Sequence, residues 1–249
     1  MYFNKDTFTV IAGPCAVEST EQCLTIAEGV KKHGAHIFRG GAYKPRSSPF
    51  NFQGLELEGL EILQKVRLLM PIVTEVTQVS TVPIVANSTN ILQIGTRNMH
   101  NIELLKAVGK ENKPVMLKRG YAALIEEEWI MAAKYLQLEG TEEIIMCERG
   151  IRTFEPYTRN TLDISAVCAI KTLTDYCVII DPSHATGRPE MIIPLSLAAA
   201  AVGADGIMVE VHNDPEKALC DGHQAITIEQ FGQLMEKLKP VVNAVGRHL

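Results

Sequence analysis

The sequence predicts an α/β fold, a single (β/α)8 or TIM barrel that spans residues 1–249. Two observations favour this fold. Short apolar runs rich in β-branched residues alternate with longer stretches of helical period, and eight such runs can be recognised. The length of 249 residues is also typical of one such barrel. The alternative is an open doubly wound sheet, which usually has fewer strands, and no GxGxxG motif follows the first run.

The predicted strands are short, apolar, and followed by segments rich in glycine or charge. They are Phe8–Ile11, Ile37–Phe38, Pro71–Glu75, Leu92–Gly95, Pro114–Lys118, Ile144–Glu148, Cys177–Asp181 and Gly206–Glu210. Because helical segments separate them, we expect the strands to pair in parallel, with all their carboxyl ends at one mouth of the barrel. Catalytic groups of such barrels lie at that mouth.

The predicted helices follow most of these strands. The first begins after Ser19, which forms a capping-box pair with Gln22 ahead of apolar residues at helical spacing. Thr227 and Gln230 form a second such pair. The later helices are Gly54–Met70, Val79–Ala86, Ile102–Val108, Leu124–Leu138, Leu162–Leu173, Ile192–Val202 and Ile228–Val245.

Composition excludes several classes of protein. The formal net charge of −5 argues against a nucleic-acid binder. No apolar run reaches the roughly 18 residues that span a bilayer, so no membrane partner is expected. The first ten residues lack the charged and apolar parts of a signal peptide, and we expect a cytoplasmic protein. The six cysteines form no CxxC pair and are expected to be reduced thiols.

Arginine is concentrated at the strand ends. Of the ten arginines, only Arg67 and Arg247 do not fall at or just after a predicted strand end. Guanidinium groups that converge on one mouth repel one another unless an anion lies between them, and arginine suits bidentate binding of phosphate and carboxylate. Because the cations come from several strand ends, the sequence predicts two small phosphorylated or otherwise anionic substrates.

A second set of residues has the chemistry of a metal site. Cys15, His184, Glu210 and Asp221 are competent ligands for a divalent metal, and they follow the first, seventh and eighth strands, which adjoin in a closed barrel. His212 and His223 are rival ligands on spacing alone. Mixed thiolate, imidazole and carboxylate ligands favour one Mn, Fe, Co or Zn ion over Ca²⁺ or Mg²⁺.

With these residues in place, the sequence resembles the 3-deoxy-D-arabino-heptulosonate 7-phosphate (DAHP) synthases, in their short type I (beta) branch. This branch is also similar to the 3-deoxy-manno-octulosonate 8-phosphate synthases. The resemblance covers residues from about 10 to about 225. It rests on the motifs AGPCAVES (12–19), FRGGAYKPRSSPFNFQGL (38–55), TEV (74–76), QIGTRNM (93–99), LKRG (117–120), ERG (148–150), DPSHATGR (181–188), ADGIMVEVH (204–212) and KALCDG (217–222).

The resemblance implies a reaction. Phosphoenolpyruvate condenses with erythrose 4-phosphate to give DAHP and phosphate, the first step of the shikimate pathway to aromatic amino acids. The segment Lys44–Pro45–Arg46–Ser47 is similar to the erythrose 4-phosphate motif, although Ser47 stands where family members often have threonine. The alternative is an octulosonate 8-phosphate synthase that uses arabinose 5-phosphate, but those enzymes carry an Asn-Arg variant of this segment.

The resemblance also implies roles for individual residues. Cys15, His184, Glu210 and Asp221 match the metal ligands. The residues that match substrate-binding positions are Arg97, Lys118 and Arg149 for the phosphate of phosphoenolpyruvate, Arg39 and Lys44 for its carboxylate, and Pro45, Arg46 and Ser47 for erythrose 4-phosphate. Lys44, Glu75 and His184 are the candidates for proton transfer in the reaction.

The resemblance further implies how the enzyme assembles. We expect a homodimer or homotetramer. The first barrel motif begins close to the first residue and the last helix ends close to the last one, so we expect no separate regulatory domain. A separate chorismate mutase chain is then a candidate partner that could supply feedback control.

Overall fold

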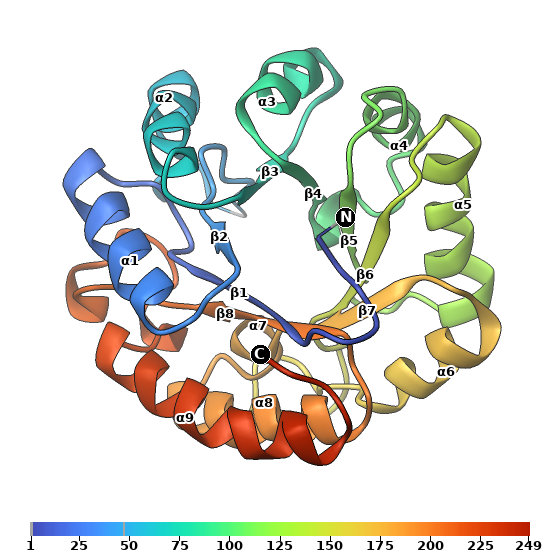
Figure 1. Cartoon of the computed structure of the whole chain (residues 1–249). Coiled ribbons are helices and arrows are strands. Elements are labelled where there is room, and N and C mark those ends of the chain that lie inside the picture. Colours follow the sequence, from blue (N-terminus) through green and yellow to red (C-terminus); the bar gives the residue numbers. More distant parts are fainter. Residues whose placement is uncertain (1, 47) are drawn as a thin grey trace.

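The structure is a computed structural model that describes residues 2–46 and 48–249. Within these residues eight parallel strands close into a barrel in the order β1 to β8, and β8 pairs with β1 (Figure 1). The strands are β1 (Thr9–Gly13), β2 (Ile37–Arg39), β3 (Ile72–Val76), β4 (Ile91–Ile94), β5 (Val115–Lys118), β6 (Ile144–Glu148), β7 (Cys177–Ile180) and β8 (Gly206–Glu210). The predicted (β/α)8 barrel is confirmed, and each strand overlaps its prediction.

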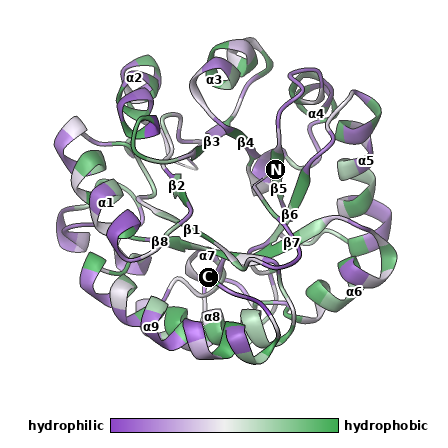
Figure 2. Cartoon of the chain, in the orientation of Figure 1, coloured by the Kyte–Doolittle hydropathy of each residue, from purple (hydrophilic) through white to green (hydrophobic). Residues whose placement is uncertain are grey.

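The helices surround the strands on the outside of the barrel, except for the short α7, which lies next to the strands inside this ring (Figure 1). They are α1 (Thr20–Lys32), α2 (Glu56–Arg67), α3 (Val82–Ser88), α4 (Ile102–Gly109), α5 (Met131–Leu138), α6 (Ser165–Leu173), α7 (Pro182–Thr186), α8 (Ile192–Ala201) and α9 (Ile228–Ala244). The strands and the inward faces of the helices are mostly hydrophobic, whereas polar residues face outward (Figure 2). The fold therefore places its main core between the strands and the helices.

Two of the helix starts were predicted from capping boxes, and they differ in outcome. At α9 both halves form, because the Thr227 hydroxyl accepts from Gln230 N and the Gln230 side chain accepts from Thr227 N. At α1 only the first half forms, since Ser19 Oγ accepts from Gln22 N at 3.0 Å. The Gln22 side chain turns instead toward Glu18 N and Ala16 O.

Two helical segments differ from the prediction. The helix predicted over Leu124–Leu138 begins as a π-helix, Ile125–Ile130, in which Trp129 N donates to Leu124 O. The fully buried Trp129 of this wider turn packs in the core between the strands and the helices, where its Nε1 donates to Leu117 O. The short helix α7 was not predicted, because five residues are too few to show a helical period.

The interior of the barrel is closed by one apolar layer. Each strand contributes a side chain to it, and Phe3 packs against this layer from the amino-terminal end. The layer consists of Ile11, Ile37, Val73, Ile91, Met116, Ile145, Cys147, Ile179 and Met208. Because this layer blocks the interior, ligands can enter the barrel only from the mouth at the carboxyl-terminal ends of the strands.

In the described part of the chain, no helix is long and apolar enough to cross a bilayer.

Candidate active site and metal centre

A polar layer lies directly above the apolar one. Side chains of a strand alternate between its two faces, so the residue two positions after each interior residue also faces the barrel axis. On this rule Arg39, Glu75, Lys118, Asp181 and Glu210 follow Ile37, Val73, Met116, Ile179 and Met208. Strand geometry thus brings two cations and three carboxyl groups to the carboxyl-terminal mouth.

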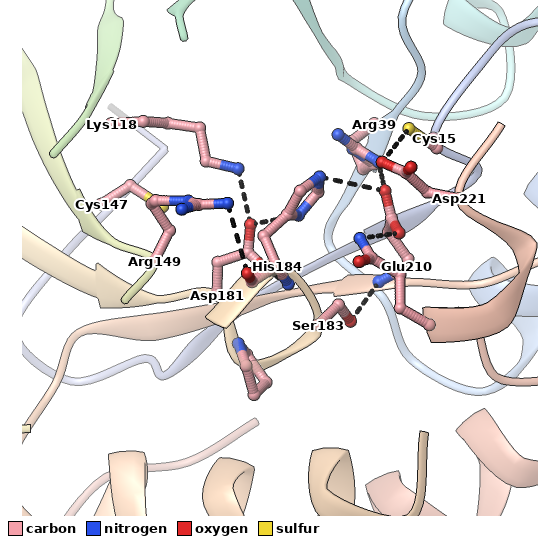
Figure 3. A network of polar contacts seen from close by, with 12 residues as sticks. Cys15, Arg39, Lys118, Cys147, Arg149, Asp181, Ser183, His184, Glu210 and Asp221 are labelled. Atoms are coloured by element: carbon pink, nitrogen blue, oxygen red, sulfur yellow. Dashed lines mark hydrogen bonds and ion pairs between the residues drawn. The ribbon is translucent and has the colours of Figure 1, made fainter. Parts of the chain in front are cut away.

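The four predicted metal ligands lie together at one side of this mouth. One ligand atom from each of Cys15, His184, Glu210 and Asp221 lies within 4.8 Å of those of the other three. His184 Nε2 is 3.2 Å from Glu210 Oε1, and Cys15 Sγ is 3.5 Å from Asp221 Oδ2. Figure 3 shows these side chains facing one another across the mouth. A sulfur, an imidazole nitrogen and two carboxylates at these spacings fit one divalent ion.

The orientation of His184 suits a ligand. Asp181 caps helix α7 by accepting from His184 N, and its Oδ2 lies 2.7 Å from His184 Nδ1. This contact leaves Nε2 directed toward Glu210, which is the carboxylate–histidine–metal arrangement of many metal sites. Burial lowers the pKa of His184 to about 4, so the imidazole is neutral near pH 7 and its lone pair is available.

The other three ligands differ in how easily they lose the proton that a metal ion must displace. A hydrogen bond with Cys220 and burial raise the pKa of Cys15 well above its ordinary value, so a metal must displace a proton from this thiol. Burial and the nearby Cys15 raise the pKa of Glu210. Burial opposes ionisation of Asp221, but His184 and Arg159 outweigh it and lower its pKa. Metal affinity should therefore rise with pH.

The backbone of Asp221 is in an uncommon conformation. Its φ of 54° and ψ of 26° lie in the left-handed region, which aspartate tolerates better than most residues. This turn directs the carboxylate back toward Cys15. Strained backbone of this kind tends to occur at functional sites.

The two rival histidines lie outside the metal cluster. His212 is buried against helix α1, where its Nε2 contacts Gln22 Nε2 at 3.1 Å and Glu18 Oε2 at 3.5 Å. His223 is exposed and lines a separate groove on the outer side of the loops. Spacing alone could not distinguish these residues from His184 and Asp221.

A pocket opens beside the metal cluster. Its lining comes from the strand ends and the following loops. The lining residues are Arg39, Lys44, Pro45, Arg46, Asn51, Glu75, Gln93, Gly95, Thr96, Arg97, Lys118, Tyr121, Arg149, Arg159, His184 and Asp221. Seven of these are arginine or lysine, and two are carboxylates, so the pocket favours anions.

Arg149 has a buried hydrogen-bond donor that faces no acceptor in the described part of the chain. Its Nη2 donates to His184 O at 3.2 Å, but its buried Nη1 has no hydrogen-bond partner among the described residues. Burial lowers the pKa of Arg149, which means that its charge is incompletely compensated. The ring of Tyr121 lies 4.9 Å from the Arg149 guanidinium and 4.7 Å from that of Arg152. A bound phosphate would satisfy the open donor.

The cations predicted to hold the carboxylate end of one substrate are tied to the metal cluster. Arg39 Nη1 donates to Glu210 Oε1 at 2.8 Å. Lys44 Nζ lies 2.8 Å from Cys15 O and 3.0 Å from Cys15 Sγ. The Nζ atom of Lys118, which was predicted at the phosphate, is 2.5 Å from Asp181 Oδ2, and the same oxygen lies 2.7 Å from His184 Nδ1. The metal cluster and the anion pocket therefore form one connected site.

The segment predicted to bind the second substrate enters the same pocket. Pro45 and Arg46 line it, and Arg46 donates to the sulfur of Cys220. Arg46 Nη2 is also 4.0 Å from Asp221 Oδ1. Ser47 lies outside the described residues. Arg97, predicted at the phosphate of the first substrate, is exposed and lines the same pocket.

Glu75 also lines the pocket. Its Oε2 accepts from Gln93 Nε2 at 3.2 Å. Gly95 leaves room for it, because a Cβ at this glycine would lie 1.9 Å from Glu75 Oε1. The carboxylate is thus held in place on one side by a hydrogen bond and on the other by close contact.

Several pocket residues were not singled out from the sequence. Asn51, Gln93, Thr96, Tyr121 and Arg159 line the pocket. Gln93 could have been found, because it is two positions beyond the interior residue Ile91 and must face the barrel axis, and Asp181 follows Ile179 in the same way. The others come from loops, whose sequence carries no comparable signal.

The fold and the site together define a (β/α)8 barrel whose mouth holds a cation-lined pocket beside a potential metal centre. Residues 3–245 match the model of the DAHP synthetase I family. The chain belongs to this family.

Known relatives agree with this assignment. The chain is 49% identical over 241 residues to the phospho-2-dehydro-3-deoxyheptonate aldolase of Thermotoga maritima, covering 96% of this chain and 71% of that protein. The crystal structure of a DAHP synthase from the same organism matches with a TM-score of 0.95 at 48% identity, over 99% of this chain and 72% of that one. A 2-dehydro-3-deoxyphosphooctonate aldolase of Geobacter sulfurreducens is 32% identical over 254 residues, covering 93% of this chain and 91% of that protein.

Proposed function

We infer that this chain is a 3-deoxy-7-phosphoheptulonate synthase, a transferase that joins phosphoenolpyruvate to erythrose 4-phosphate and releases phosphate. The family and the 49% identity to the Thermotoga protein support this reaction. The inference rests on one observation: the four-residue metal cluster adjoins a pocket lined by seven arginine and lysine side chains, and His184 and Asp221 belong to both. Such a site suits two anions that react beside one Lewis acid.

The phosphoenolpyruvate phosphate is assigned to Arg97, Lys118 and Arg149. All three line the same pocket, and the open Nη1 of Arg149 supplies a donor for a phosphate oxygen. Arg39 and Lys44 lie near the metal cluster and are assigned to the carboxylate. This arrangement would fix both ends of the substrate and leave its C3 carbon directed at the second substrate.

Formation of the carbon–carbon bond requires the aldehyde of erythrose 4-phosphate to accept electrons from C3. When bound by Cys15, His184, Glu210 and Asp221, a divalent ion supplies the Lewis acidity that polarises this carbonyl. Lys44 is assigned as the acid that protonates the developing alkoxide, because its Nζ lies 3.0 Å from Cys15 Sγ at the edge of the metal cluster.

The second half of the reaction consumes one water molecule. Its oxygen adds to the cationic C2 carbon, and phosphate then leaves, so that phosphoenolpyruvate, erythrose 4-phosphate and water give DAHP and phosphate. Glu75 or His184 is assigned as the proton acceptor, and both side chains line the pocket. Arg97, Lys118 and Arg149 stabilise the charge of the departing phosphate.

The choice of the second substrate can be tested directly. Erythrose 4-phosphate and arabinose 5-phosphate are offered in turn to the metal-loaded protein, and the loss of phosphoenolpyruvate absorbance is followed. We expect turnover with erythrose 4-phosphate, because the Lys44–Pro45–Arg46 segment enters the pocket. Faster turnover with arabinose 5-phosphate would instead assign the chain to the octulosonate branch, whose compared member is only 32% identical.

We also propose that the native ion is Mn, Fe, Co or Zn, since a thiol and an imidazole contribute to the cluster. Metal analysis of the purified protein tests this. A cytoplasmic location, a homodimeric or homotetrameric state and a chorismate mutase partner are further proposals. Cell fractionation tests the location, and light scattering tests the oligomeric state. Co-purification tests the partner, and assays with phenylalanine, tyrosine, chorismate and prephenate test feedback control.

A further inference from the structure

Gln224 is a fully buried glutamine that contacts one of the proposed metal ligands. It lies in the turn after Asp221, and its relative exposure is 0%. Its Nε2 donates to Glu210 Oε2 at 2.6 Å, and its Oε1 accepts from Arg159 Nη1 at 2.8 Å. The amide therefore bridges a metal-site carboxylate and an arginine from the β6–α6 loop.

The two contacts fix the orientation of the amide. A carboxylate only accepts hydrogen bonds and a guanidinium only donates them. A flipped amide would place its oxygen against Glu210 and its NH₂ group against Arg159, which would break both hydrogen bonds. Arg159 thus determines which end of the Gln224 amide faces Glu210.

Arg159 also reaches the second carboxylate of the cluster, since its Nη1 is 3.5 Å from Asp221 Oδ2. Gln224 N donates to the backbone carbonyl of Asp221 at 3.1 Å, which ties the two residues into one turn. Glu210 Oε1 is meanwhile held by Arg39 at 2.8 Å and lies 3.2 Å from His184 Nε2. Both carboxylate oxygens of Glu210 are therefore held by side chains of this protein, Oε1 by Arg39 and Oε2 by Gln224.

We propose that Arg159 and Gln224 form a positioning relay that holds Glu210 and Asp221 in the orientation that binds the divalent ion. Neither residue needs to contact the ion. The relay removes rotational freedom from the Glu210 carboxylate, and Arg159 offsets the repulsion between the two carboxylates. Partners of this kind around metal ligands typically change metal affinity by about 10–100-fold. The proposal rests on the metal site assigned above.

The test measures Co²⁺ binding by the metal-free full chain without substrates. Gln224→Met keeps the side-chain length but removes both amide contacts, and we expect Co²⁺ to bind about 10–100-fold more weakly. The sulfur-to-cobalt absorption should persist, because Cys15 is unchanged, while the ligand-field bands should shift. Gln22→Met is the matched control, since Gln22 is also buried and contacts none of the four ligands.

A double-mutant cycle separates a relay from two independent contacts. Arg159→Met alone should also weaken Co²⁺ binding. The loss in the double variant should be smaller than the sum of the two single losses, because the Arg159–Gln224 contact can be lost only once, while the direct Arg159–Asp221 contact accounts for the remainder. Additive losses would overturn the relay, as would Co²⁺ binding by Gln224→Met that matches the wild type. If the wild-type chain itself binds no stoichiometric ion, the assigned metal site falls together with the relay.

Equal weakening in Gln224→Met and Gln22→Met would also count against the proposal, because it would reflect a general loss of packing. Melting of the metal-free variants identifies this case. A specific positioning role leaves the two variants similar in melting temperature and different in Co²⁺ affinity.

Discussion

The sulfur atoms of Cys15 and Cys220 lie 3.1 Å apart, although the two cysteines are 205 residues apart in the chain. Both side chains are buried. Hydrogen bonding to Cys15 lowers the pKa of Cys220 against the effect of burial, and Lys44 acts in the same direction. Cys220 is therefore the more acidic thiol of the pair, and the thiolate is the form that reacts with oxidants.

This contact predicts that peroxide inactivates the metal-free protein. The Cys220 thiolate attacks hydrogen peroxide and becomes a sulfenic acid, and the Cys15 thiol then displaces water to form a disulfide. The sulfurs need to approach by only about 1 Å, because a disulfide bond is about 2.05 Å long. We expect two thiols to disappear together, with loss of metal binding that dithiothreitol reverses.

Cys220→Ser and metal-loaded protein serve as the comparisons for this oxidation. Neither should form the disulfide, because one lacks a partner sulfur and the other has its Cys15 sulfur occupied. A peptide map of the oxidised wild type that links Cys15 to any cysteine other than Cys220 would refute the assignment.

A Cys15→Ala substitution tests the sulfur ligand itself. Loss of an outer partner of a ligand costs about 10–100-fold in metal affinity, so loss of the ligand should cost at least that much and abolish metal-dependent turnover. The barrel should stay folded, because alanine fits the space of the buried thiol. Metal content, activity and melting temperature are measured, with the exposed Cys168→Ala as control. Full activity in confirmed metal-free Cys15→Ala would show that the metal assignment is wrong.

Arg149→Ala tests the open hydrogen-bond donor in the pocket. Its removal should lower kcat/KM for phosphoenolpyruvate by about 100- to 1000-fold, the usual cost of losing a donor to a developing negative charge. Arg152→Ala is the matched control, because Arg152 contacts the same Tyr121 ring but is exposed and does not line the pocket. Similar kinetics for the two variants would contradict a phosphate role for Arg149.

The strand pattern explains why so much of the site could be predicted from the sequence. Parallel strands end at the same mouth, so a functional residue that follows one strand must lie near those that follow its neighbours. Glu210 is the last residue of β8 and Cys15 follows β1, and these two strands are paired with Gly13 opposite Glu210. Arg39 and Lys118 lie two positions beyond interior residues, which directs them to the barrel axis.

The remaining features depend on contacts that sequence spacing does not encode. His212 is two positions beyond Glu210, but the chain has left the strand there and turns its ring toward Gln22. The partners of Gln224 come from a strand and from a loop about 65 residues away, so no local pattern marks it. The π-helix at Ile125–Ile130 likewise accompanies the tertiary packing of Trp129.

Acid should weaken the fold partly through His36. Its Nδ1 accepts from Val10 N at 3.0 Å, which requires a neutral acceptor nitrogen, and burial lowers its pKa below the ordinary 6.5. The folded state then binds fewer protons than the unfolded one, so stability is full above pH 6.5 and falls as the pH drops toward the folded pKa.

Urea unfolding of the wild type and of His36→Asn tests this titration. Asparagine can accept the same hydrogen bond without titrating. As the pH falls below 6.5, the free energy of unfolding should therefore decrease more for the wild type than for His36→Asn. Other titrating groups, including His184, are common to both proteins and cancel. If the stability difference between wild type and His36→Asn does not change with pH, protonation of His36 does not contribute to acid destabilisation.

Gly95→Ala tests whether the position of Glu75 matters for the reaction. The backbone of Gly95, with φ of −73° and ψ of 161°, accepts any residue. The nearest obstacle to an added Cβ is the Glu75 carboxylate, whose Oε1 would lie 1.9 Å from it. Glu75 must move, and kcat should fall by about 100-fold or more, as when a proton-transfer group is displaced, with little change in melting temperature. If displacement of Glu75 is the whole cause, Gly95→Ala should add nothing to the loss in Glu75→Ala. A normal kcat in Gly95→Ala, or a further loss in the double variant, would mean that Glu75 is not the group through which Gly95 acts.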